Sequence, residues 1–309
     1  MTGGGGGACG HGKVILVGEH AAVYGHPVLA GASDRGVTLR ATARPGPLAL
    51  RVDGWDLTVT AGEAHPVEPA LRAIANALGL EDGWTLAGTS DLPPAAGLGS
   101  SAALAVAMTR ALAIGLERVL TDDQIEAAAT QAERCFHGNP SGVDVALATR
   151  GGLGRFVRGE GLTAITGAPL TLAIGLSGQS RATAIMVERV AQARRERAEV
   201  DDELAALGAG AERAAAILAR AVLDDRALAA LGAIFTEAHE RLGRIGVSTA
   251  ELDAMVASAS QRGALGAKLT GGGGGGSVIA LAPGREDDVI AGWRRLGKDG
   301  FVTCVGGRS

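Results

Sequence analysis

The sequence predicts an α+β protein of two domains. Strand and helix patterns mix in the first half of the chain, helices dominate the second half, and two late strands close it. Strands with helices, followed by helices with late strands, are typical of α+β architecture. The length of 309 residues also fits two domains of about 150 residues each. We place the boundary near residue 168, so the predicted domains span residues 1–168 and 169–309.

The first predicted domain opens with a short apolar strand at residues 13–17. Two further apolar runs flank Asp53-Gly54, a strong signal for a two-residue hairpin turn. Later, apolar side chains recur at helical spacing on residues 122–136. The expected strands are therefore 13–17, 48–52, 55–59 and 84–87, and the expected helices are 69–78, 101–114 and 122–136.

The second predicted domain is mostly helical. One strand is expected first, at residues 170–176, and the charged run at 194–197 is expected on a solvated helix face. The remaining expected helices are 183–200, 203–223, 226–242, 249–262 and 286–296, and the late strands are 277–281 and 301–305.

The composition excludes several classes of protein. Glycine occurs 49 times but without a G-X-Y period, which excludes collagen. A net charge of −4 argues against a nucleic-acid or membrane-surface binder that relies on positive charge, and no stretch has the character of a transmembrane helix. Three scattered cysteines without metal-ligand spacing indicate reduced thiols in a cytoplasmic protein. We expect neither nucleic acid nor membrane as a partner.

The first glycine-rich segment resembles a P-loop in spacing alone. Residues 7–13 match the spacing, but Val14 replaces the Ser/Thr that would hold Mg²⁺. A strand rather than a helix is also expected to follow. We reject a P-loop here.

The second glycine-rich segment, residues 92–103, leads into the helix predicted at 101–114. The free N–H groups of a first helical turn and the positive end of its dipole bind anions, and glycine lets a phosphate approach the backbone. Ser100 and Ser101 would add hydroxyl groups to a phosphate or to its metal. An ordinary serine N-cap on a structural helix is the alternative.

The third segment holds six consecutive glycines at residues 271–276. A flexible linker is one interpretation. However, apolar segments enclose the run and a strand restarts at Ser277, which favours a tight loop whose backbone closely approaches another group.

Polar side chains gather between these segments. Glu19 and His20 directly follow the strand at 13–17, and Asp144 follows a turn rich in Asn, Pro and Gly. Such a turn can hold a carboxylate rigidly for proton abstraction or for pairing with a cation. Glu133 is typical of a solvated helix residue when taken alone, but beside a phosphate loop it is a candidate Mg²⁺ ligand.

Taken together, the segments resemble the GHMP small-molecule kinases, and among them the mevalonate kinase branch. Four ordered motifs carry the resemblance: G-K-V-I-L-V-G-E-H-A-A-V-Y-G at 12–25, P-P-A-A-G-L-G-S-S-A-A at 93–103, H-G-N-P-S-G-V-D at 137–144 and K-L-T-G-G-G-G-G-G at 268–276. They extend across nearly the whole chain. The resemblance implies a two-domain fold with ATP in the cleft between the domains.

The implied reaction is ATP-dependent phosphorylation of the 5-hydroxyl of mevalonate, with Mg²⁺ as the cofactor. By motif position, Asp144 resembles the catalytic base, and Lys13 the cation that keeps it ionised and helps neutralise the transferring phosphoryl group. Ser101 and Glu133 match the Mg²⁺ ligands. The residues matching the ATP phosphate site are Pro94, Ala95, Ala96, Gly97, Leu98, Gly99, Ser100, Ser101, Ala102, Gly271, Gly272 and Gly273. Those matching the substrate site are Lys13, Glu19, His20, Asp144, Arg181, Thr183 and Gly272.

Two small residues depart from the family pattern. Ala95 stands where the second motif often has Gly, and Gly272 where the last often has Ala; both exchanges are expected to be tolerated. The rival functions are another kinase of the superfamily, acting on phosphomevalonate, a sugar or homoserine, and a nucleotide-binding regulator without catalysis. Retention of Lys13 and Asp144 argues against the regulator. The oligomeric state is left open, with a homodimer among the alternatives.

Overall fold

The computed structural model describes residues 7–137, 140–179 and 183–307, and the chain forms two compact units. Unit 1 comprises the described residues of Met1–Lys13, Arg35–Pro94 and Gly99–Gly151. Unit 2 comprises those of Val14–Asp34, Ala95–Leu98 and Gly152–Ser309. Each unit is made of several separate segments of the chain, so the units differ in kind from two continuous domains. The division into residues 1–168 and 169–309 stays a prediction.

Unit 1 contains a β-sheet, and the second half of the long strand β2 (Val28–Ala43) is one of its strands. The strands follow the order β4 (Leu57–Thr60), β3 (Ala49–Val52), β5 (Trp84–Ser90), β2, and β1 (Ala8–Val17) also pairs with β2. Only the β3–β5 pair in this series is parallel. Val52 pairs with Leu57, so the hairpin loop is longer than the predicted two-residue turn at Asp53-Gly54. That expected turn is wrong, and Asp56 takes the left-handed φ of 50° in the loop.

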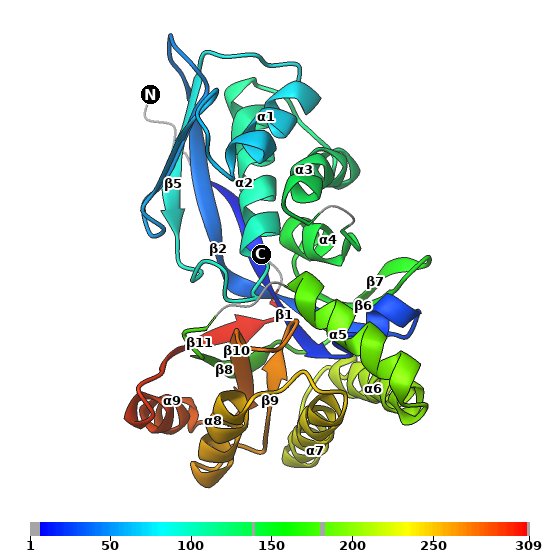
Figure 1. Ribbon diagram of the computed structural model, residues 1–309. Coiled ribbons are helices and arrows are strands. Elements are labelled where there is room, and N and C mark those ends of the chain that lie inside the picture. Colours follow the sequence, from blue (N-terminus) through cyan, green and yellow to red (C-terminus); the bar gives the residue numbers. More distant parts are fainter. Residues whose placement is uncertain (1–6, 138–139, 180–182, 308–309) are drawn as a thin grey trace. The chain divides into compact units, whose positions relative to one another are not determined.

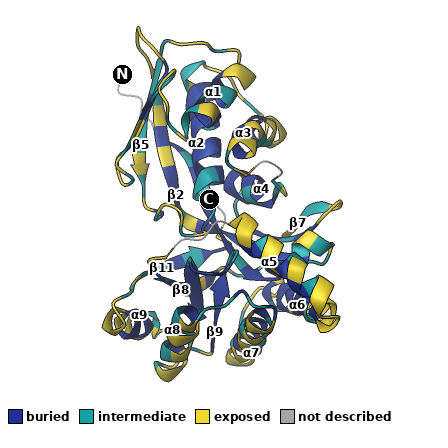
Figure 2. Cartoon of the chain, viewed as in Figure 1, coloured by how far each residue is buried: buried dark blue, intermediate teal, exposed yellow. Residues whose placement is uncertain are grey.

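Four helices of unit 1 lie on one side of these strands (Figure 1): α1 (Glu68–Ala77), α2 (Ser100–Gly115), α3 (Asp122–His137) and α4 (Val143–Arg150). Because α2 packs against α1, α3 and α4, it is apolar around most of its circumference. Figure 2 shows α2 buried over much of its length. Its many alanines allow close packing on several sides, and this fixes the helix that starts beside the second glycine-rich segment.

Unit 2 is built on an antiparallel sheet. Its strands follow the order β2, β11 (Asp299–Val305), β8 (Leu170–Leu176), β10 (Ser277–Leu281), β9 (Gly266–Thr270). The first half of β2 also pairs with β6 (Leu153–Val157), which pairs with β7 (Gly161–Ile165). Trp293 and Phe235 are the largest fully buried side chains.

The helices of unit 2 are the short η1 (Ala21–Tyr24), then α5 (Thr183–Glu196), α6 (Glu199–Leu218), α7 (Asp225–Arg244), α8 (Ala250–Gln261) and α9 (Glu286–Arg295). The side chains of Asp224 and Thr249 accept hydrogen bonds from N–H groups in the first turns of α7 and α8, which sets where these helices begin. None of the helices in the described ranges is long and apolar enough to cross a bilayer.

Several strands and helices of the structure were not predicted from the sequence patterns. β2 carries Asp34 and Arg35 in its middle, and β9 carries the charged Lys268, so neither follows a simple apolar alternation. α4 is only 8 residues long and places Asp144 in its first turn. The rejection of a P-loop is confirmed, because residues 8–13 belong to β1.

Candidate active site

Lys13 and Asp144 form an ion pair in unit 1. Lys13 lies on β1, Asp144 lies in the first turn of α4, and the Nζ and Oδ1 atoms are 2.9 Å apart. The Lys13 side chain is 7% exposed and that of Asp144 is 30% exposed. The ammonium is therefore shielded, whereas the carboxylate remains accessible to a small molecule. The predicted catalytic pair is brought together.

Ser101 and Glu133 form the second polar contact of unit 1. The Ser101 hydroxyl donates to Glu133 Oε1 at 3.0 Å, which joins the start of α2 to α3. Burial, together with the negative charge of Asp144, raises the pKa of Glu133 to about 7, although Ser101 and Lys13 act in the opposite direction. His137 Nε2 lies 3.3 Å from Ser101 Oγ and 3.4 Å from Glu133 Oε1.

The Ser101–Glu133 pair fits a Mg²⁺ ion. Glu133 is 2% exposed, and among the described residues its Oε2 atom has no hydrogen-bond partner. A buried carboxylate oxygen without a donor is costly, and a divalent cation coordinated by carboxylate and hydroxyl oxygens would compensate it. The described residues contain no cluster of three or more His, Cys, Asp or Glu suited to a metal. A metal held here would therefore take its remaining ligands from phosphates and water, as Mg²⁺ usually does.

The second glycine-rich segment bends sharply before α2. Gly97 and Gly99 have φ values of 79° and 72°. Gly99 is the N-cap of α2 and no side chain caps the helix, so the alternative of a serine N-cap is wrong. The first-turn N–H groups thus have no side-chain acceptor at the cap, as an anion site requires. Ala95 has φ 55°, a conformation that costs alanine about 1 kcal/mol more than glycine, and the expected tolerance of this exchange stays a prediction.

The remaining residues predicted for the phosphates divide between the two units. Ala96 and Leu98 lie in unit 2, and Pro94, Ser100 and Ala102 lie in unit 1. Within unit 2, the Ser277 hydroxyl donates to the carbonyl oxygen of Ala96 at 2.8 Å. This bond ties the tip of the second glycine-rich segment to the start of β10.

The six-glycine run in unit 2 is a structured loop between β9 and β10, and the flexible-linker interpretation is wrong. Gly271, Gly273 and Gly276 have φ values of 85°, 76° and 82°, which side chains with a Cβ rarely adopt. A Cβ on Gly273 would lie 2.3 Å from the carbonyl oxygen of Val247. The Gly274 N–H donates to that same oxygen at 2.8 Å. Glycine is thus required by close backbone contact.

His20, Gly272 and Thr183 lie together in unit 2. His20 has φ 62° and its Nε2 donates to the Gly272 carbonyl at 2.9 Å. Burial lowers the pKa of His20, although the hydrogen bond to Gly272 raises it. A Cβ on Gly272 would lie 3.2 Å from Thr183 Oγ1, so these two residues are immediate neighbours. Arg181, which was predicted beside Thr183, lies outside the described residues.

Glu19 forms a buried ion pair with Lys268 of β9. Lys268 Nζ contacts Glu19 Oε1 and donates to the Leu269 carbonyl at 2.7 Å. The two side chains are 0% and 1% exposed. Burial lowers the pKa of Lys268, and the charge of Glu19 opposes that shift. The predicted substrate residue Glu19 is therefore tightly held next to His20.

The sequence patterns assigned no role to Lys268 or His137. Both stand inside quoted motifs, yet the charge of Lys268 lies within an apolar strand and gives no indication of its partner. His137 stands four residues after Glu133 on α3, the spacing that places two side chains on one helix face. That spacing is the signal that would have identified His137.

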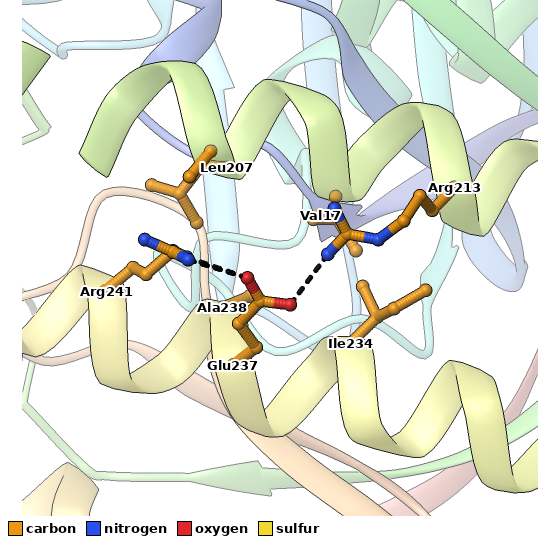
Figure 3. A pocket seen from close by; sticks show the side chains of 9 residues that line it. Val17, Leu207, Arg213, Ile234, Glu237, Ala238 and Arg241 are labelled. Carbon is orange, nitrogen blue, oxygen red and sulfur yellow. Dashed lines mark hydrogen bonds and ion pairs between the residues drawn. The ribbon is translucent and has the colours of Figure 1, made fainter. Parts of the chain in front are cut away.

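A separate small recess lies between α6 and α7 (Figure 3). Glu237 bridges Arg213 at 2.6 Å and Arg241 at 2.8 Å across it. Apolar side chains, among them Val17 and Leu207, complete its lining. None of the predicted site residues lines this recess. Its guanidinium groups are already satisfied by a carboxylate, so it has no free charge to offer a ligand.

The site combines a Lys–Asp pair, an uncapped helix start and two glycine-lined loops. Such features are typical of enzymes that position phosphates and neutralise their charge. Comparison with known proteins gives the class. The profile for the GHMP kinases N terminal domain matches residues 65–152, and that for GHMP kinases C terminal matches residues 215–299. This chain belongs to the GHMP kinase family, and its α+β fold is the fold of that family.

Mevalonate kinases stand among its relatives. That of Pyrococcus horikoshii is 32% identical, over 95% of this chain and 93% of its own. That of Aeropyrum pernix is 34% identical, over 87% of this chain and 86% of its own. Among solved structures, an L. major mevalonate kinase in complex with R-mevalonate has a TM-score of 0.87 and 27% identity, covering 97% of this chain and 96% of that one.

Proposed function

We propose that this kinase transfers the γ-phosphoryl group of ATP to the 5-hydroxyl of mevalonate, giving 5-phosphomevalonate and ADP. The Lys13–Asp144 pair, at 2.9 Å, carries the proposal. An accessible carboxylate beside a shielded ammonium suits a reaction in which an alcohol loses a proton while negative phosphate arrives. A protein that only binds nucleotide has no use for this arrangement.

In the proposed mechanism, Asp144 accepts the proton of the attacking hydroxyl. The ion pair to Lys13 fixes the position of the carboxylate, and α4 holds it from the backbone side. Lys13 also offers positive charge to the transferring phosphoryl oxygens. Such positioning and charge neutralisation provide most of the catalysis in phosphoryl transfer.

The ATP phosphates are proposed to bind along residues 94–102 and Gly271–Gly273 through backbone N–H groups. Ser101 and Glu133 are proposed to hold Mg²⁺, with Glu133 Oε2 as the oxygen that among the described atoms lacks a donor. The ion would supply charge neutralisation to the phosphates when bound. The hydrogen bond from the Ser101 hydroxyl to Glu133 Oε1, at 3.0 Å, keeps the oxygens of the two side chains close together.

Mevalonate is proposed to contact His20 and Thr183, with Arg181 and Gly272 in the same group. Glu19 belongs to it by motif position, and its burial against Lys268 supports a role in orienting the adjacent His20. The similarity to the L. major enzyme with R-mevalonate also supports this substrate. A cytoplasmic location stays a prediction from the scattered cysteines, and a homodimer stays an assembly to test by light scattering.

The product identifies the reaction. Incubation with ATP, Mg²⁺ and mevalonate, followed by ³¹P NMR, is expected to show a phosphomonoester coupled to the C5 methylene protons. Asp144→Asn, run in parallel, is expected to form that signal far more slowly. Phosphate released as inorganic phosphate alone would reject transfer to mevalonate.

A further inference from the structure

Lysine is rare in this chain. Only three of its 29 basic residues are lysine, at positions 13, 268 and 298, and all others are arginine. Each of the three forms an ion pair with a carboxylate: Lys13 with Asp144, Lys268 with Glu19 and Lys298 with Glu251. The first two belong to the candidate site. The third belongs to no motif and has no assigned role.

Lys298 lies in the short connection between α9 and β11, and its side chain is only 18% exposed. Its Nζ contacts Glu251 Oε1, in the first turn of α8, and donates to the carbonyl oxygen of Ser177 at 2.7 Å. Within the described part of the chain, the other carboxylate oxygen of Glu251 is buried without a hydrogen-bond partner. Glu251 therefore depends on Lys298 for compensation of its charge.

Ser177 is in turn hydrogen-bonded to the six-glycine loop. Its N–H donates to the Gly276 carbonyl at 2.9 Å, while the Gly276 N–H donates to the Gln179 carbonyl at 2.7 Å. The Ser177 hydroxyl donates to that same Gln179 oxygen at 3.1 Å. A Cβ on Gly275 would lie 2.7 Å from it, so the loop and the turn at 177–179 are in close backbone contact.

We propose that Lys298 is a positioning residue for the glycine-rich loop. By holding the Ser177 carbonyl against Glu251, it fixes the turn at 177–179, and this turn fixes Gly275 and Gly276 at the end of the loop. The inference rests on the proposed function, in which Gly271–Gly273 of this loop line the ATP phosphates. Lysine suits the position because one compact ammonium can donate to a carboxylate and to a carbonyl at once, whereas the planar guanidinium of arginine needs more room.

The test uses four variants of the full chain. Lys298→Met removes the hydrogen bond to the Ser177 carbonyl. Glu251→Gln keeps that hydrogen bond but removes the carboxylate charge beside it. The double variant Lys298→Met/Glu251→Gln removes both charges of the pair. Arg294→Met is the matched control, since Arg294 is 66% exposed and lies near Lys298 in the chain. Each is measured for amide hydrogen exchange by NMR without nucleotide, for thermal unfolding, and for the KM of ATP and of mevalonate.

Lys298→Met is expected to speed exchange of the Ser177 and Gly276 amides and to raise the KM for ATP by about tenfold, the scale of one lost hydrogen bond to a charged group. The kcat, which the proposed mechanism assigns to the Lys13–Asp144 pair, should change by less than about twofold. The double variant should regain thermal stability but keep both the fast exchange and the raised KM. Glu251→Gln should affect the KM less than Lys298→Met, and Arg294→Met should match wild type.

The proposal is overturned if Lys298→Met leaves the two amides and the KM for ATP unchanged. It is equally overturned if the double variant restores wild-type exchange and KM along with stability, because Lys298 would then only neutralise Glu251. If Lys298→Met does not fold, the double variant decides. Failure of the proposed function is recognised separately, as wild-type protein that does not turn over ATP with mevalonate, while the exchange data still test the contact.

Discussion

Lys13 Nζ lies 2.9 Å from Asp144 Oδ1, although one residue stands on the first strand and the other in the first turn of α4. Gly99, the N-cap of α2, is close to the same lysine, because a Cβ on it would lie 3.1 Å from Lys13 Cβ. The ammonium of Lys13, the proposed base Asp144 and the start of α2 thus lie together within unit 1.

The first prediction concerns the base. Asp144→Asn keeps the shape of the side chain but removes the proton acceptor, so kcat should fall by about 10²–10⁴-fold, the usual contribution of a general base. The Kd for ATP, measured by calorimetry, should stay within a few-fold of wild type. Near-normal turnover in a steady-state assay would contradict the assignment.

The second prediction concerns the metal ligands. Ser101→Ala removes a hydroxyl that donates to Glu133 at 3.0 Å and is expected to raise the Mg²⁺ concentration needed for half-maximal activity by about tenfold. Ser260→Ala is a suitable control, because Ser260 is an exposed residue of α8 whose hydroxyl bonds to the backbone of its own helix. An unchanged Mg²⁺ titration for Ser101→Ala would exclude Ser101 as a ligand.

The side chains that the short motifs bring together could be predicted from the sequence, whereas their roles in the reaction stay a prediction. The motifs predict that Lys13 lies with Asp144 and Ser101 with Glu133, and both pairs are in contact. What escaped prediction is the set of long-range partners. Lys268 is hidden in a buried strand, and the contact of Lys298 with Ser177 joins segments 121 positions apart. Such pairings depend on sheet order and register, which local patterns do not encode.

The fold shows the same division. The helices α3 and α7 were found because apolar side chains recur along them at helical spacing, and α2 was found because its alanine-rich run favours a helix. β2 was missed because it carries Asp34 and Arg35 where it passes from unit 2 to unit 1. α4 was missed because a helix of 8 residues shows little periodicity, and so Asp144 was expected after a turn rather than inside a helix.

The third prediction concerns the glycine-rich loop. Gly273→Ala must place a methyl group at φ 76° and 2.3 Å from the Val247 carbonyl, so it should destabilise the protein by about 2 kcal/mol or more. Gly272→Ala is the matched control, since its backbone is not left-handed and its new Cβ would lie 3.2 Å from Thr183 side-chain atoms, a tight contact but a much milder one than 2.3 Å. It should cost less than about 1 kcal/mol. Urea unfolding measures both, and equal losses would contradict the account.

The fourth prediction concerns pH. His239 Nδ1 accepts a hydrogen bond from the Leu269 N–H at 3.4 Å, and Nε2 lies 3.2 Å from Asp253 Oδ1. Burial lowers the pKa of His239, with Lys268 adding to that effect and Asp253 and Glu240 opposing it. Below the ordinary histidine pKa of 6.5, the unfolded chain therefore binds more protons than the folded one. This contribution to stability is complete above that pH and is lost as the pH falls through the lowered value.

His239→Gln should consequently flatten the dependence of the unfolding free energy on pH between about 5 and 7. The dependence that remains includes His20, whose pKa burial also lowers. Urea unfolding at a series of pH values compares the two proteins. Curves that run parallel over this range would show that His239 is not responsible.

The acceptor of the phosphoryl group is identified by measuring ADP release with ATP and Mg²⁺ across four alcohols: mevalonate, phosphomevalonate, galactose and homoserine. We expect kcat/KM to be highest for mevalonate, by at least about a hundredfold, because the site must match the acceptor as well as the phosphates. A higher value for another acceptor would assign the protein to a different kinase of the family. No acceptor-dependent ADP release with any of the four would contradict the proposed catalysis by Lys13 and Asp144.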